Sequence, residues 1–388
     1  MMQPRRALAL LLLCGLLASD PLAAAAPGVE ADRIVFGQSA ALEGPAAALG
    51  QEMRRGILAA FAEVNAAGGI GGRRLELVSY DDGYEPERAI DNTERLIEED
   101  RVFALIGAVG TPTSAAVAPI AVASGVPFIG PFTGAEFLRD PALTTVVNVR
   151  ASYFQETERI AAWLTDEQGI DRIAVLYQDD SFGRVGLQGM RQALARRGLE
   201  VVSQGVYPRN TTAVKRALLA IRQGDPEAVV IVGTYAPSAA FTLWARKLGL
   251  PVLFVNLSFV GSEALAQALV EHAPDGAAVA DTYISQVVPP PDGETLPLLA
   301  QYRAAIGGDT SFISLEGYIA GRLAIAVLQA IEGEPTREAF LASLQRIGSF
   351  DLGGFALRYG PGDNQGSDAV FLTAVEADGR IVAVEDRP

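Results

Sequence analysis

Short apolar, β-branched runs alternate along the chain with longer segments whose apolar residues recur at helical spacing. Residues 48–69 are an example, because Met53, Ile57, Phe61 and Val64 fall on one face of a helix that two closing glycines would stop. This alternation is typical of βα units on a parallel sheet.

The alternation forms two successive series, which predicts two lobes of similar construction. In the first we expect strands at 33–39, 74–82, 102–107 and 126–130 and helices at 48–69, 86–100 and 115–123. In the second we expect helices at 154–168, 185–197, 213–222 and 238–247 and strands at 172–177, 200–207, 228–233 and 252–256. The sequence after these two series predicts a rigid link at 289–291, helices near 296–306 and 315–332, and a hairpin turned by Asp378 and Gly379.

Length and composition agree with two lobes of the α/β class. At 388 residues the chain exceeds what one hydrophobic core usually serves, and 49% apolar with 20% charged residues is typical of a well-packed globular protein. No period of about 20 to 50 residues repeats, which argues against a solenoid.

The first 25 residues have the pattern of a secretory signal peptide, in which Arg5 and Arg6 precede an apolar stretch and small residues end near Ala25. We therefore expect the mature protein to be soluble and exported. Cys14 leaves lipidation open, although Leu13 stands where a lipobox usually has a small residue. Without this segment 29 basic and 45 acidic residues remain, and a net charge of −16 repels nucleic acid and anionic lipid.

The same composition excludes most enzyme chemistry. Beyond the predicted signal peptide there is no cysteine, which excludes disulfides, thiol nucleophiles and Cys-ligated metal. His272 is the only histidine, and we interpret it as a surface residue at a helix end. We expect no catalytic residue, no metal and no cofactor; a hydrolase with a carboxylate pair is the one enzyme class left open.

Hydroxyl residues follow the strand at 102–107, where a helix begins. Ligands of open parallel sheets bind beyond the carboxyl ends of the strands. There Thr111, Thr113 and Ser114 would add donors to the N–H groups of a helix N-terminus, which suits an anion such as a small carboxylate. An equal alternative is that Thr113 or Ser114 caps the helix.

Phe132, Thr133 and Gly134 follow the next strand in the same way. Gly134 would let a ligand approach the backbone closely; a turn with Phe132 in the core is the alternative. The glycines at 183, 186 and 189 lack the spacing of a dinucleotide loop. The acidic cluster at 81–85 lacks the spacing of a calcium loop and is interpreted as a solvated strand end.

Five blocks in order along the chain resemble a known family. They are residues 38–89, "LIEEDRVFALIGAVGTPTSAAVAPI" at 96–120, "GVPFIGPFTGA" at 125–135, "RIAVLYQDDSFGRVGL" at 172–187 and "SFVGSEAL" at 258–265. Together they resemble the type I periplasmic solute-binding proteins of ABC importers, in particular the leucine/isoleucine/valine-binding branch.

The resemblance implies two Rossmann-like lobes joined by a three-strand hinge, with a ligand enclosed as the lobes close. The crossovers are expected near residues 148–151, 280–283 and 350–353. Lobe 1 then comprises residues 30–149 plus 282–350, and lobe 2 residues 150–281 plus 351–388, after a signal peptide at residues 1–25.

Matching positions also imply a ligand site. Thr111 matches the hydroxyl that binds the α-carboxylate of an amino acid, and Phe132 and Gly134, with Thr133 between them, match backbone contacts to the same head group. Other positions match the walls of the cleft: Phe182, Tyr235 and Leu49, the last where amino-acid binders often have a tryptophan.

Ser258 departs from the resemblance. The leucine-type proteins have a glutamate there that pairs with the ligand's ammonium group, and burying that charge without a carboxylate would be costly. Either another acid takes over or the ligand lacks an ammonium group. Glu316 is the first candidate substitute, with Asp179 and Asp180 behind it and a solvated helix residue as the alternative for Glu316.

The resemblance therefore implies a receptor that binds a small amino acid or related carboxylate and delivers it to the membrane permease of an ABC importer. Hinge closure would be its mechanism, because a ligand that contacts both lobes favours the closed state. The alternative is a ligand-sensing subunit for a separate signalling partner.

Overall fold

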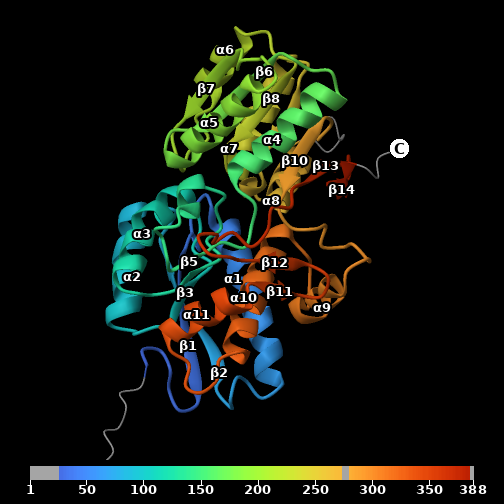
Figure 1. Cartoon of the computed structure of the whole chain (residues 1–388). Helices are drawn as coiled ribbons and strands as arrows, with labels where there is room; N and C mark the ends of the chain where they lie inside the picture. Colours follow the sequence, from blue (N-terminus) through green and yellow to red (C-terminus); the bar gives the residue numbers. More distant parts are fainter. Residues whose placement is uncertain (1–25, 273–278, 385–388) are drawn as a thin grey trace, which may run out of the picture.

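Two lobes, each built around a mainly parallel β-sheet, make up the molecule (Figure 1). The structure is a computed structural model that describes residues 26–272 and 279–384. The predicted signal peptide, including Cys14, lies outside the described residues.

The first lobe contains a five-stranded parallel sheet in the order β2-β1-β3-β4-β5. Its strands are β1 (Arg33–Ala40), β2 (Arg74–Asp81), β3 (Ala104–Ile106), β4 (Phe128–Ile129) and β5 (Val146–Val147). Its helices are α1 (Ala47–Ala66), α2 (Pro86–Glu98), α3 (Thr111–Ala123), the 3-10 turn η1 (Glu136–Arg139), α9 (Pro297–Ile306), α10 (Phe312–Gln329) and α11 (Arg337–Ile347). The hairpin of β11 (Ser349–Asp351) and β12 (Ala356–Arg358) lies beside these late helices (Figure 1).

The second lobe contains a seven-stranded sheet in the order β14-β13-β10-β9-β8-β6-β7, in which only β13 and β14 run antiparallel to their neighbours. Its strands are β6 (Ile173–Gln178), β7 (Ser203–Tyr207), β8 (Ala228–Val232), β9 (Leu253–Asn256), β10 (Thr282–Gln286), β13 (Phe371–Val375) and β14 (Ile381–Ala383). Its helices are α4 (Tyr153–Ala162), η2 (Trp163–Glu167), α5 (Ser181–Ala195), α6 (Lys215–Arg222), α7 (Tyr235–Lys247), η3 (Ser258–Val260) and α8 (Ser262–His272).

The predicted lobe boundaries need correction at two of the three crossovers. The first crossover follows β5, as expected. Residues 282–286 form β10, which pairs with β9 and β13 and therefore belongs to lobe 2, so the second crossover comes after Gln286. Residues 351–358 remain with lobe 1, where the carbonyl of Gly353 accepts a hydrogen bond from the N–H of Leu298 in α9. The third crossover therefore lies at residues 363–370, beside Asn148 of the first.

Close packing of α10 on α1 fixes the late helices to lobe 1. A Cβ at Gly56 of α1 would lie 1.9 Å from the carbonyl oxygen of Ser314, and one at Gly317 would lie 2.3 Å from that of Met53. Only glycine permits this backbone approach. α10 is long and apolar enough to cross a membrane, but most of it is buried in the lobe, so it is a core helix.

The acidic cluster at 81–85 is not the solvated strand end that we expected. Asp82 is fully buried, and its carboxylate accepts hydrogen bonds from Ser39 Oγ at 2.9 Å and from the N–H of Tyr84 at 2.8 Å. Burial raises its pKa to about 6. Asp81 accepts hydrogen bonds from the N–H groups of residues 42 and 43. The cluster therefore holds the loop that follows β2.

This loop contacts lobe 2 directly. Arg209 donates to Glu85 Oε2 at 2.5 Å, and Asn210 Nδ2 donates to Glu85 Oε1 at 2.7 Å. The N–H of Phe312, the first residue of α10, donates to Glu263 Oε1 of α8 at 2.9 Å. These contacts join the two lobes, which are closed on each other.

Candidate functional site

The hydroxyl residues after β3 lie inside the first turn of α3 instead of before it. Gly110 is the N-cap, with φ of 103°, and no side chain caps the helix, so the capping interpretation of Thr113 and Ser114 is wrong. Thr113 donates back to the carbonyls of Val109 and Gly110. Thr111 Oγ1 lies 2.7 Å from Thr133 Oγ1, which brings the two predicted hydroxyls together.

The loop after β4 packs its predicted residues into the interface between the lobes. Phe132 is 1% exposed, and the Arg150 guanidinium carbon lies 5.1 Å from the centre of its ring. A Cβ on Gly134 would lie 2.8 Å from the backbone nitrogen of Tyr153. Close approach to the first crossover therefore accounts for this glycine, and its contact with a ligand stays a prediction.

An aromatic cluster spans the two lobes and is centred on Phe259 of η3. The centre of the Phe259 ring lies 4.7 Å from that of Phe182, 5.2 Å from that of Phe132 and 5.9 Å from that of Tyr84. Tyr153 adds a contact with Phe182 at 5.3 Å. Phe132 and Tyr84 come from lobe 1, while Phe182 and Phe259 come from lobe 2, so closure assembles one apolar wall.

Arg150, on the first crossover, occupies the centre of a fully buried charged cluster. Its guanidinium lies 3.0 Å from Glu156 Oε1 and 3.5 Å from Glu316 Oε2, and it also donates to Ser258 Oγ. Ser258 Oγ in turn donates to Glu156 Oε1, and the other carboxylate oxygen of Glu156 accepts from Ser285 Oγ at 2.6 Å. Burial alone would lower the pKa of Arg150, but the charges of Glu316 and Glu156 raise it.

The carboxylate of Glu316 is less fully hydrogen-bonded than that of Glu156. Its Oε1 is buried and has no hydrogen-bond partner among the described residues. Burial raises the pKa of Glu316 to about 7, which Arg150 partly offsets and Glu156 increases. The alternative of a solvated helix residue is wrong, because Glu316 is 1% exposed.

The two other candidate acids are already engaged. Asp180 is the N-cap of α5, where it accepts hydrogen bonds from the N–H groups of Phe182 and Gly183, and its second oxygen accepts from Gln178. Asp179 is exposed and pairs with Arg184 at 3.1 Å.

The predicted site residues therefore converge, with one exception. Thr111, Thr133, Phe132, Phe182, Ser258 and Glu316 are each at most 6% exposed where the lobes meet. Tyr235 at the start of α7 is only partly buried and lies outside the aromatic cluster, near Leu49 and Gly261.

A family model described as "Periplasmic binding protein" matches residues 33–380. This chain belongs to the periplasmic binding protein family. The fold agrees, with two α/β lobes of type I, and relatives place it in the leucine/isoleucine/valine-binding branch.

Among the relatives of this binding protein is Leu/Ile/Val-binding protein homolog 7 of Brucella suis biovar 1, 29% identical over 59% of the chain and 58% of that protein. The chain thus spans about three fifths of the length of the curated relatives it first matches. Homolog 8 of Brucella abortus (strain 2308) is 26% identical over 90% of both chains. A crystal structure of a possible leucine/isoleucine/valine-binding protein from Rhodopirellula baltica SH 1 is 39% identical over 92% of this chain and 98% of that one, with a TM-score of 0.86.

Members of this family bind solutes and are not enzymes. Across the described ranges, no three His, Asp or Glu side chains are arranged to hold a metal ion. His272 is exposed at the end of α8 with its ring bonded to the carbonyl of Ala268, which confirms its interpretation as a helix-end residue.

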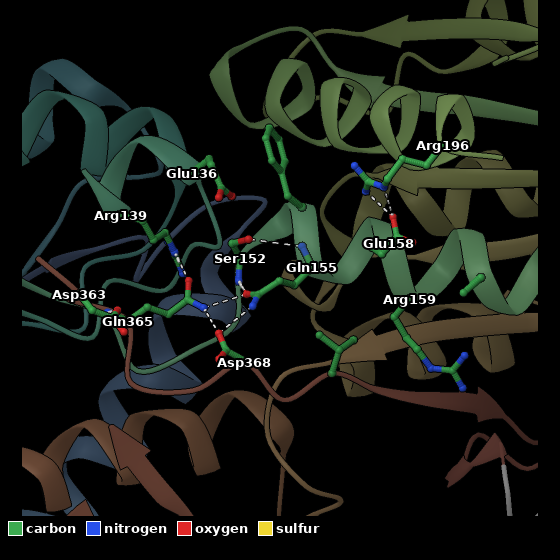
Figure 2. Close-up of a pocket in the computed structure, with 13 residues that line it drawn as sticks. Glu136, Arg139, Ser152, Gln155, Glu158, Arg159, Arg196, Asp363, Gln365 and Asp368 are labelled. Atoms are coloured by element: carbon green, nitrogen blue, oxygen red, sulfur yellow. Dashed lines mark hydrogen bonds and ion pairs between the residues drawn. The ribbon is translucent and has the colours of Figure 1, made fainter. Parts of the chain in front are cut away.

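One cavity of the binding protein lies apart from this site. It has a volume of about 780 Å³ and lies beside the hinge, between η1, α4, α5 and the third crossover (Figure 2). Its walls contain basic and acidic side chains, and Arg196 forms an ion pair with Glu158 on one of these walls.

Sequence reasoning missed four important residues of the site: Arg150, Glu156, Tyr84 and Phe259. Two of them lie next to features that were singled out, since Phe259 follows Ser258 and Tyr84 belongs to the acidic cluster. Arg150 offered one signal, because it is a charged residue at a predicted crossover between apolar segments.

Proposed function

We propose that this protein is a periplasmic receptor that captures a small α-amino acid between its lobes and delivers it to the permease of an ABC importer. The observation that carries the proposal is the unpartnered carboxylate oxygen of Glu316, which lies buried where the lobes meet. A ligand ammonium group is the partner that such an oxygen lacks.

Charge balance favours an amino acid over a simple carboxylate. Arg150 pairs with two acids, Glu156 and Glu316, and the charge of Arg139 also acts on Glu316, so two cations face two acids. A ligand with only a carboxylate would add a further negative charge to this buried cluster, whereas the ammonium of a zwitterion would balance Glu316. Glu316 then takes the place of the glutamate that Ser258 replaces.

The carboxylate of the amino acid would bind at the start of α3. Thr111 and Thr133 place two hydroxyls there, and Ser114 Oγ is buried with no partner in the part of the chain that the structure describes. N–H groups and the helix dipole favour an anion at this end of a helix. The aromatic cluster around Phe259 would cover the apolar part of the ligand.

Lobe closure follows from the way these ligand contacts are divided between the lobes and the hinge. The carboxylate contacts belong to lobe 1, the aromatic wall comes from both lobes, and Arg150 lies on the crossover between them. A ligand that makes all these contacts only in the closed state shifts the equilibrium toward closure. The permease would then recognise the closed shape.

Thermal unfolding of the mature protein, stripped of ligand by unfolding and refolding, tests the proposal. The panel contains leucine, the other amino acids and the matching 2-keto acids. A ligand at about 100 times its Kd adds about 2.7 kcal/mol to the free energy of unfolding, which raises the midpoint clearly. We expect an amino acid to do so and its keto acid not to.

Glu316→Gln and a matched control sharpen this test. Glu316→Gln keeps the size of the side chain but removes the charge, so the response to the amino acid should be lost. Glu338→Gln, at an exposed position of α11, should respond like the wild type. A midpoint raised only by keto acids would overturn the assignment of Glu316 and the amino-acid class.

A further inference from the structure

Arg139, at the end of η1, uses its whole guanidinium group to hold backbone and amide oxygens. Nε donates to Gln365 Oε1 at 2.8 Å, Nη1 to the carbonyl of Ala135 at 2.9 Å and Nη2 to the carbonyl of Arg150 at 3.0 Å. Longer bonds of 3.4 Å reach the carbonyls of residues 133 and 151. All five acceptors are neutral.

These acceptors belong to three different segments. Residues 133–135 form the loop that carries Thr133, residues 150–151 form the first crossover beside the buried charged cluster, and Gln365 lies on the third crossover. One side chain thus ties the loop of the proposed ligand site to two of the three hinge strands.

The network continues into lobe 2 through Gln365 (Figure 2). Gln365 Nε2 donates to Gln155 Oε1 at 2.8 Å and to Asp368 Oδ1 at 2.6 Å, and Gln155 Nε2 donates to the same Asp368 oxygen at 2.7 Å. Gln155 forms the capping box of α4 together with Ser152. The first turn of lobe 2 is therefore connected to Arg139 by two hydrogen bonds in sequence.

A guanidinium in this place is costly for stability. Burial lowers the pKa of Arg139 to about 10, and the neighbouring charge of Arg150 lowers it as well. An apolar side chain there would avoid this cost but would leave the bonded backbone and amide oxygens without their donor. The presence of arginine points to a role in geometry, since its planar fork can hold several acceptors in fixed directions.

We propose that Arg139 is a positioning residue that couples the ligand loop to the hinge, so that closure brings Thr133 and Arg150 together in one fixed arrangement. This inference rests on the proposed function. To the proposed function it adds a residue, Arg139, that links ligand contact at the loop with bending at the crossovers.

Distance measurements between the lobes test the coupling without a known ligand. Because the chain has no cysteine after the predicted signal peptide, Glu338→Cys on lobe 1 and Arg222→Cys on lobe 2 give two unique sites for spin labels. Both positions are exposed. In this background we expect Arg139→Gln to broaden the distribution of distances between the lobes, and Gln365→Leu to reproduce much of the broadening.

The matched control is Arg196→Gln, which removes another arginine from the wall of the same cavity. Within the described residues, the side chain of Arg196 bonds to Glu158 and to no residue of the hinge, so its loss should leave the distribution unchanged. Arg139→Ala offers a rescue, because the cavity beside the side chain would admit guanidinium. We expect millimolar guanidinium to narrow the broadened distribution again, and sodium chloride at the same ionic strength not to.

The proposal is overturned if Arg139→Gln lowers the thermal midpoint but leaves the distances as in the wild type, since Arg139 would then serve stability alone. Gln365→Leu and Arg139→Lys keep the test decisive if Arg139→Gln fails to fold. If no amino acid raises the midpoint in the ligand screen, the proposed ligand class is wrong, but the distance measurements still decide the role of Arg139. The two proposals can therefore fail separately.

Discussion

Glu316 is the side chain whose proton would be exchanged when an amino acid binds. In the free protein burial raises its pKa to about 7, with Arg150 acting against the rise and Glu156 adding to it. An ammonium group beside it favours the ionised form. Affinity should therefore fall as the pH drops below about 7, by up to about tenfold per pH unit, and level off at higher pH.

Titration calorimetry across this range measures the effect. Glu316→Gln should bind weakly at every pH, with a flat profile. The opposite slope, with tighter binding at low pH, would mean that the ligand is an anion that requires the neutral acid.

At the scale of single residues, the sequence pointed to Glu316 as the acid but not to the residues that surround it. Glu316 and Ser258 could be named because a resemblance supplied the position where a carboxylate was missing. Arg150 offered a signal by its position, but its partners could not be predicted, since they lie 6, 108 and 166 residues away along the chain and no local pattern connects them. Only the folded arrangement shows that Ser258 bridges Arg150 and Glu156.

Among the elements, α5 connects helix stability to the site most directly. Asp180 caps this helix, and the ring of the second residue, Phe182, enters the aromatic cluster. Asp180→Ala should lower the free energy of unfolding by about 1 kcal/mol and also weaken ligand binding, because the first turn would lose its anchor. Asp180→Asn, which can still cap, should behave more like the wild type.

Thr336→Ala is the matched control for the cap. Thr336 caps α11 by accepting from the N–H of Ala339 at 3.1 Å, in a helix that carries no residue of the site. Urea denaturation should show a similar loss of stability, while calorimetry should show unchanged affinity. Equal affinity losses in both variants would contradict a local role for the Asp180 cap.

The pattern of apolar residues predicted most of the elements but fewer of their ends. Thr111 lies inside α3 because Pro112 is tolerated in a first turn, where no N–H is needed. The assignment of residues 282–286 to lobe 1 was wrong, and the pattern could not have decided it, since a buried strand has the same pattern in either sheet. Pairing with β9 and β13 decides this, and pairing is a property of the assembled fold.

For the molecule as a whole, the contact of Glu85 with Arg209 and Asn210 holds the lobes closed at the rim. Glu85 comes from lobe 1 and its two partners from lobe 2, at 2.5 and 2.7 Å. The side chains of Glu85 and Arg209 are 43% and 22% exposed, so the ion pair contributes about 1 kcal/mol at most. Glu85→Gln should therefore raise the ratio of open to closed molecules by up to about fivefold.

X-ray scattering of the ligand-free protein at low salt measures this shift as a larger radius of gyration. Raising the ionic strength to about 0.15 M shortens the screening length to about 8 Å and should move the wild type part of the way toward the variant. Glu334→Gln is the control, because its exposed ion pair with Arg73 joins two residues of lobe 1. If both variants scatter alike, the rim contact does not bias closure, and the burial of the aromatic and charged clusters alone keeps the lobes together.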